Sequence, residues 1–147
     1  NKILTYIMGN SQTIRKINFE DMQTATRNPE IYLIINTLPS NEQNCLIVNT
    51  ISIDEEETII NEYMTKPPKD IRIIIYGKNC NDECVNNKYK QLQKLGFNNI
   101  FIYLGGLFEW LMLQDIYGKE LFLTTKNELD ILRFKPSPLL NVALIGN

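Results

Sequence analysis

The sequence contains no histidine among its 147 residues. This absence removes the commonest general base, proton shuttle and metal ligand at neutral pH. Any chemistry that the chain performs must therefore use Cys, Asp, Glu, Lys, Tyr or backbone amides. A tetrahedral zinc site would need two ligands beyond a pair of cysteines on one helix, and few candidates remain without histidine. We therefore expect neither a metal ion nor another cofactor.

Cysteine is also scarce, with Cys45, Cys80 and Cys84 as its three occurrences. An odd number of cysteines in a chain without a signal peptide disfavours a secreted disulfide framework, so we expect reduced thiols and a cytoplasmic location. No apolar run approaches the ~20 residues that would span a bilayer.

Positive charge is not in excess, since the net charge is −2 and the isoelectric point is about 5.2. This balance gives no electrostatic reason to expect a nucleic-acid partner. The hydrophobic content of 44% and the charged content of 22% are ordinary for a soluble globular protein. A chain of this length has room for one domain with a real core.

Short apolar runs that are rich in β-branched residues and flanked by turn signals predict strands buried on both faces. They span residues 31–36, 45–53, 71–76 and 100–104. Helical patterns lie around and between these runs, and they begin near residues 18, 54, 83 and 107. The alternation predicts a single α/β domain with a central parallel sheet of about five strands and helices on both faces.

Two helix boundaries have specific signals. Asn18 can cap the first helix, and Asp21 at the third helical position can complete a capping box with it. Near the other end, Thr125 or Asn127 is expected to cap a short helix that two following prolines prevent from continuing.

Three segments together resemble the rhodanese-like domain, a small α/β fold with a central parallel sheet. They are "INFEDMQ", "IRIIIYGKNCNDECVNNKYKQLQKLGF" and "NIFIYLGGLFEW". The last is the most specific, because Gly105, Gly106 and Trp110 reproduce the family's strand, paired glycine and tryptophan. The resemblance runs from about Ile17 to Phe134. It implies a domain at residues 17–135, an N-terminal extension at 1–16 and a C-terminal tail at 136–147.

The resemblance also implies an active-site loop after the strand that ends at Tyr76. It comprises residues 77–84, and its candidate site residues are Gly77, Lys78, Asn79, Asn81, Asp82 and Glu83. In the family a cysteine normally opens this loop and an arginine often closes it. Here Gly77 stands at the opening position, and no arginine lies between Gly77 and Leu104. Resemblance to the fold therefore does not establish the sulfurtransferase activity of the family.

The upstream landmarks of the family are altered as well. Asn36 stands where an aspartate usually ends the first core strand, and Leu38 where an arginine is common. A phosphatase of the related fold is a weaker interpretation, because it would require a cysteine in place of Gly77 and an arginine to bind the phosphoryl oxygens.

Two functional hypotheses remain. In the first, the domain has lost standard thiosulfate sulfurtransferase chemistry and acts as a binding or regulatory module for a protein partner, because Asp82 and Glu83 disfavour a thiolate or an anionic guest. In the second, Cys80 carries persulfide sulfur from a small sulfur donor or undergoes redox exchange, and Cys84 resolves it. The backbone amides at the start of the following helix would then hold the anion.

The helix after the paired glycine is apolar around more than one face, which indicates deep burial or packing against something outside the domain. Its large apolar residues are Phe108, Trp110, Leu111, Leu113, Ile116 and Tyr117.

"MGNSQT", residues 8–13, fits the N-myristoylation pattern, with Gly9 as the acceptor if Met8 is the true start. The alternative is an internal Met-Gly pair with a chance threonine. A single acyl chain would give only weak, reversible membrane tethering, and no polybasic stretch supplies a second signal.

Overall fold

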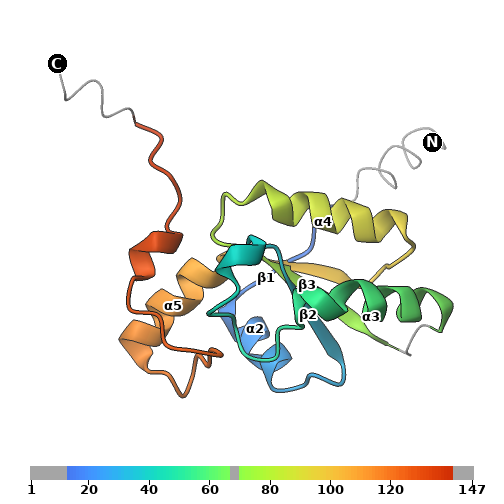
Figure 1. Cartoon of the computed structure of the whole chain (residues 1–147), viewed down its shortest axis with the longest axis horizontal. Helices are drawn as coiled ribbons and strands as arrows, with labels where there is room; N and C mark the ends of the chain where they lie inside the picture. The colour runs from blue at the N-terminus through green and yellow to red at the C-terminus, as the bar shows by residue number, and fades with distance from the viewer. Residues whose placement is uncertain (1–12, 67–69, 141–147) are drawn as a thin grey trace.

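Four short parallel strands form the centre of the chain in a computed structural model that describes residues 13–66 and 70–140 (Figure 1). The strands are β1 (Lys16–Ile17), β2 (Tyr32–Asn36), β3 (Arg72–Tyr76) and β4 (Ile100–Tyr103), in the order β1-β4-β3-β2. In the register, Ile34 of β2 lies beside Ile74 of β3, which lies beside Phe101 of β4. All three pairings are parallel, so the carboxyl ends of the strands meet at one edge of the sheet.

Helices cover both faces of this sheet, which confirms the predicted α/β architecture. On one face, α3 (Ile53–Thr65) and α4 (Glu83–Lys94) pack on Ile73, Ile75 and their neighbours. On the other face, α2 (Phe19–Thr26) and α5 (Gly106–Tyr117) pack on Ile74 and Tyr76. Because successive side chains of a strand point to opposite faces, the isoleucine run of β3 supplies both cores at once.

The helix boundaries follow local capping chemistry. At the start of α2, Asn18 Oδ1 accepts from Asp21 N at 2.9 Å and Asp21 Oδ2 accepts from Asn18 N at 3.3 Å, which completes the predicted capping box. Ser52 caps α3 and Asp82 caps α4 through their side-chain oxygens. After α4, Gly96 has a φ of +102°, the left-handed conformation that favours glycine at a helix end.

The prediction of about five strands is wrong, and the main reason lies in residues 45–53. This segment forms only isolated bridges, from Ile47 to Thr124 and from Thr50 to Ile34. Asn49 has a φ of +65°, and Thr50 N donates to Ile47 O at 3.2 Å, so the chain turns instead of extending. Cys45, which was expected in a core strand, is buried but lies outside any strand.

Two other local predictions need correction. The N-terminal pattern gave no strand before residue 18, yet Lys16–Ile17 forms β1 and pairs with β4. The short C-terminal helix is a 3₁₀ helix, η2 (Ile131–Phe134), so it begins well after Thr125 and Asn127. Thr125 instead forms two hydrogen bonds with Leu46. Thr125 Oγ1 accepts from the Leu46 N–H, and the Thr125 N–H donates to the Leu46 carbonyl.

Helix α5 has both a buried face and an exposed apolar face. Leu107, Trp110 and Leu111 are fully buried, and Trp110 Nε1 donates to Leu123 O at 3.1 Å. Ile116 and Tyr117 remain 64% and 63% exposed. Within the described ranges, α5 and every other helix is too short or too polar to cross a membrane.

Candidate functional site

The loop at residues 77–84 lies at the carboxyl edge of the sheet, between the end of β3 and the start of α4. Thr37, directly after β2, donates its N–H to Tyr76 O at 3.0 Å and so reaches the same place. The carboxyl edge of a parallel sheet is where ligands bind in open α/β folds. A cavity of about 460 Å³ opens here, and its lining residues are Thr37, Pro39, Lys78, Asn79, Asn81, Asp82, Cys84 and Ser137.

The carboxylate of Asp82 points back into the loop and accepts hydrogen bonds from two of its backbone N–H groups. Its Oδ2 accepts from the backbone N–H of Lys78 at 3.1 Å and from the hydroxyl of Thr37 at 3.1 Å. Its Oδ1 accepts from the backbone N–H of Cys84 at 3.0 Å and so caps α4. A carboxylate at a helix N-terminus is stabilised both by these donors and by the helix dipole.

Gly77 is buried against this carboxylate. A Cβ atom at residue 77 would lie 2.2 Å from Asp82 Oδ2 and 2.6 Å from Val85 Cγ2. Both distances are far below van der Waals contact. Since three hydrogen bonds hold the Asp82 side chain, any residue other than glycine at position 77 would have to displace it.

The start of α5 is attached to the back of the loop. Leu107 N donates to Gly77 O at 2.9 Å, and Phe108 N donates to Lys78 O at 3.0 Å. Gly106 has a φ of +67°, and a Cβ there would lie 2.6 Å from Gly77 O. This close approach of two backbones requires glycine at residue 106.

Asn79 holds the loop to the C-terminal part of the chain. Its side chain is buried, Nδ2 donates to Phe134 O at 2.9 Å, and Oδ1 accepts from Asn81 N at 2.9 Å. Phe134 itself is fully buried at the end of η2. The residues that follow it therefore pass the cavity, which explains why Ser137 forms part of the wall.

The two loop cysteines are exposed, and neither forms a disulfide. The hydrogen bond of the Cys80 thiol within the described residues goes to Asn81 Oδ1 at 3.7 Å, so the sulfur does not sit among the loop amides. The negative charge of Asp82, and to a smaller extent partial burial, raises the pKa of Cys84. Cys45 is far less accessible, and burial raises its pKa too.

The charges around the cavity are mostly negative. Of the described residues that line it, Lys78 alone carries a positive charge, and its Nζ lies 3.6 Å from Glu42 Oε1. Glu83 is exposed in the first turn of α4. Over residues 13–66 and 70–140, no three Cys, Asp or Glu side chains gather as the ligands of a metal ion would.

The structure adds residues that the sequence patterns did not single out, namely Thr37, Pro39, Glu42 and Ser137. Thr37 could have been found, because it follows β2 as Gly77 follows β3, and parallel strands end at the same edge. Asn36, at the end of β2, has a structural role: its Oδ1 accepts from Leu38 N at 3.0 Å and from Gln43 Nε2 at 2.8 Å. Gly9, the candidate acylation site, lies outside the described residues.

Comparison with known families agrees with this arrangement. The family model described as "Rhodanese-like domain" matches residues 20–113, more than half of the chain. The chain belongs to the rhodanese-like domain family. None of the curated proteins is similar enough to match it.

Solved structures of other proteins share this fold at low sequence identity. The BH2092 protein of Bacillus halodurans is 18% identical, with a TM-score of 0.54, and the match covers 76% of this chain and 82% of that one. The Alr3790 protein of Anabaena sp. is 16% identical, with a TM-score of 0.54 and coverage of 80% and 97%. The single domain sulfurtransferase RDL2 of Saccharomyces cerevisiae is 18% identical, with a TM-score of 0.50 and coverage of 73% and 96%.

Proposed function

We propose that this rhodanese-like domain is a binding or regulatory module that lacks standard thiosulfate sulfurtransferase activity, with residues 77–84 as its functional surface. The observation that supports the proposal is the position of Asp82. Its carboxylate takes the backbone N–H groups of Lys78 and Cys84, and it fills the space beside Gly77 that a cysteine side chain would need.

An anionic sulfur donor would be repelled from this loop. Two like charges about 4 Å apart near a protein surface repel by about 4 kcal/mol, whereas a hydrogen bond to a charged group contributes about 1.5 to 3 kcal/mol. A single additional hydrogen bond would therefore not offset the charge of Asp82. Lys78 does not compensate for it either, because its ammonium group is paired with Glu42.

The competing hypothesis is a Cys80-dependent sulfur or redox carrier with Cys84 as the resolving thiol. The observation in its favour is that both thiols are exposed and belong to the same loop and helix start. Two observations count against it. In the described part of the chain the Cys80 thiol bonds only the Asn81 side chain, and the negative charge of Asp82 disfavours the thiolate of Cys84.

Intact-mass spectrometry separates the two hypotheses. The native chain, Cys80→Ser and Cys84→Ser would each be incubated with thiosulfate and, separately, with a persulfide donor. We expect no sulfur adduct from thiosulfate on any of the three chains. An adduct of one sulfur atom on the native chain that disappears in Cys80→Ser would overturn the proposal and establish the carrier.

The binding role needs its own test, because lost activity does not prove a partner. A photo-crosslinking amino acid would be placed at Asn81, which is exposed in the loop, and at Glu30, which is exposed before β2 at the other end of the sheet. We expect the chain labelled at Asn81 to capture a protein that the Glu30 control does not. The captured protein, once purified, should bind the native domain and should lose affinity for Glu83→Lys. Equal capture from both positions would count against this surface.

A further inference from the structure

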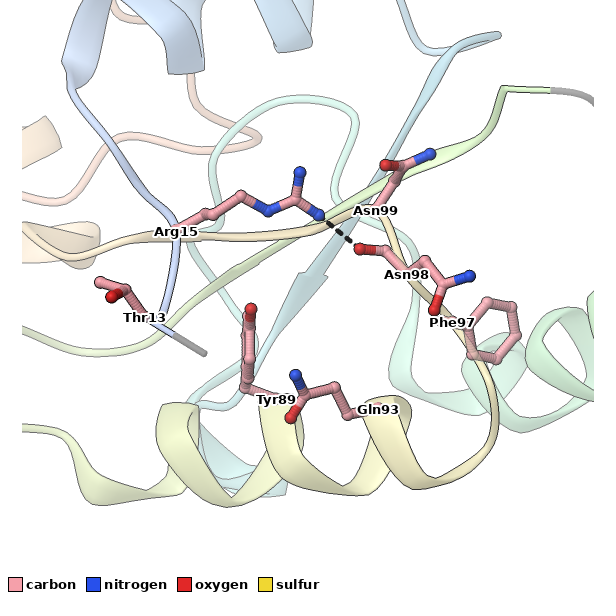
Figure 2. Close-up of a pocket in the computed structure, with 7 residues that line it drawn as sticks. All are labelled: Thr13, Arg15, Tyr89, Gln93, Phe97, Asn98 and Asn99. Carbon is pink, nitrogen blue, oxygen red and sulfur yellow. Dashed lines mark hydrogen bonds between the residues drawn. The ribbon is translucent and has the colours of Figure 1, made fainter. Parts of the chain in front are cut away.

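A second cavity lies at the opposite end of α4 from the loop, beneath the segment that leads into β1 (Figure 2). Its volume is about 490 Å³, within the range of small-molecule sites. It is lined by Thr13, Arg15, Tyr89, Gln93, Phe97, Asn98 and Asn99. These residues come from the segment before β1, the second half of α4 and the turn before β4, so the cavity is separate from the site described above.

Tyr89 forms part of the floor of the cavity, and its hydroxyl group points into it. The residue is only 5% exposed, and its ring packs in the core beneath the sheet. Figure 2 shows its phenol pointing from α4 up into the cavity, below Arg15. Among the described residues, no group hydrogen-bonds the Tyr89 hydroxyl, which opens into the cavity. Phenylalanine would fill the same core position, so the hydroxyl is available to a ligand.

Arg15 forms the roof. Its guanidinium donates to Asn98 O and lies 4.5 Å from the centre of the Phe101 ring, and these two contacts hold the side chain extended across the cavity. No acidic side chain in the described part of the protein pairs with Arg15. The remaining N–H groups of the guanidinium are therefore free to bind an anion.

Neutral polar groups complete the lining. Gln93, Asn98 and Asn99 are exposed at the rim of the cavity, and their side-chain amides make no hydrogen bond with other described residues. Phe97 supplies an aromatic wall, and none of the described residues that line the cavity is acidic. We propose that this cavity binds a small organic carboxylate, with the carboxylate on Arg15 and the Tyr89 hydroxyl and with amide or hydroxyl groups of the ligand on Gln93, Asn98 and Asn99.

A planar monoanion fits better here than a phosphate. One guanidinium matches a carboxylate in a bidentate geometry. The cavity lacks lysine among its described lining residues, and it faces the C-terminal half of α4, where the helix dipole disfavours every negative charge and therefore a dianion more than a monoanion. This inference does not depend on the function proposed for the loop.

Nuclear magnetic resonance of the full chain labelled with ¹⁵N would test the site with a matched pair of probes. N-acetylglycine carries a carboxylate and an amide, and N-acetylglycine N-methylamide is its neutral analogue. We expect saturable shifts of the Gln93, Asn98 and Asn99 signals with the acid and none with the neutral analogue. Inorganic phosphate should bind more weakly than the acid.

Variants would assign the contacts. Arg15→Gln and Tyr89→Phe should each weaken binding about tenfold or more, as expected for hydrogen bonds to a charged group. Arg27→Gln, a change of an exposed arginine outside this cavity, should leave the affinity unchanged. The preserved spectrum of each variant checks its fold. Absence of saturable shifts at the three residues, equal binding of the neutral analogue or of phosphate, or unchanged affinity in Tyr89→Phe would overturn the proposal.

Discussion

Replacing Asp82 with asparagine tests whether its carboxylate is held as tightly as the structure indicates. Asparagine keeps one acceptor oxygen, which can still cap α4 through the Cys84 N–H, and it is as good a cap as aspartate. The Oδ2 oxygen is replaced by an NH₂ group, which then faces the backbone N–H of Lys78. If the amide turns over, the Lys78 contact is restored and the cap is lost. In either orientation one backbone donor loses its acceptor.

The expected cost follows from the hydrogen bonds. A hydrogen bond to a charged group contributes about 1.5 to 3 kcal/mol, and a buried donor without a partner costs about 1 to 3 kcal/mol. We therefore expect Asp82→Asn to lower the free energy of unfolding by about 2 kcal/mol. Asp82→Ala also removes the cap, which adds about 0.5 to 2 kcal/mol.

Urea unfolding of the native chain and the variants would measure these differences, read at equal m-values. Glu83→Gln is the matched control, because it removes the same charge one residue further along the first turn of α4. Glu83 is exposed there, so the control should lose only the helix-dipole contribution of about 0.3 to 1 kcal/mol. If Asp82→Asn costs no more than Glu83→Gln, the carboxylate is not bound within the loop and the reasoning fails.

Three further changes have defined outcomes. Gly106→Ala should lower the free energy of unfolding by about 2 to 5 kcal/mol, because it combines left-handed backbone strain with a clash against a backbone oxygen. Gly96→Ala, where a Cβ atom has open space, should cost only about 1 to 2 kcal/mol in the same denaturant assay. Equal costs would refute the close approach of the backbone at Gly106. Tyr76→Phe should cost about 1 to 3 kcal/mol in the same assay, since it leaves a buried N–H without its acceptor, and a neutral effect would contradict this. Asp82→Asn should lower the pKa of Cys84, so alkylation of that thiol at neutral pH should become faster, and an unchanged rate–pH profile would exclude the charge as the cause.

The sequence was sufficient for most of the fold because the signals are local. In β3 three consecutive isoleucines are buried on both faces of the strand, with no polar residue among them. The capping box joins Asn18 to Asp21, which lies only three residues further along the chain. The prediction of a strand at residues 45–53 was wrong because the composition of the segment is typical of a strand, whereas a residue distant in the sequence determines its conformation. The hydroxyl of Tyr76 accepts from Ile47 N at 3.1 Å and bonds Thr50 Oγ1 at 2.8 Å, which favours the turn.

The position of the candidate loop could be predicted, but not its internal arrangement. The acids at residues 82 and 83 look equivalent in the sequence, yet one side chain turns into the loop and the other stays exposed. That difference depends on Thr37, which is 45 residues away in the chain. The second cavity was not predictable for the same reason, because Arg15 meets its partner Asn98 across 83 residues.

Crystals of the native chain soaked in thiosulfate would test the central claim most directly. We expect the Asp82 carboxylate to keep its contacts with Lys78 N, Cys84 N and Thr37 Oγ1, and we expect no ion to enter the loop. A thiosulfate ion surrounded by the backbone N–H groups of residues 78–84, with Asp82 turned out to solvent, would contradict it.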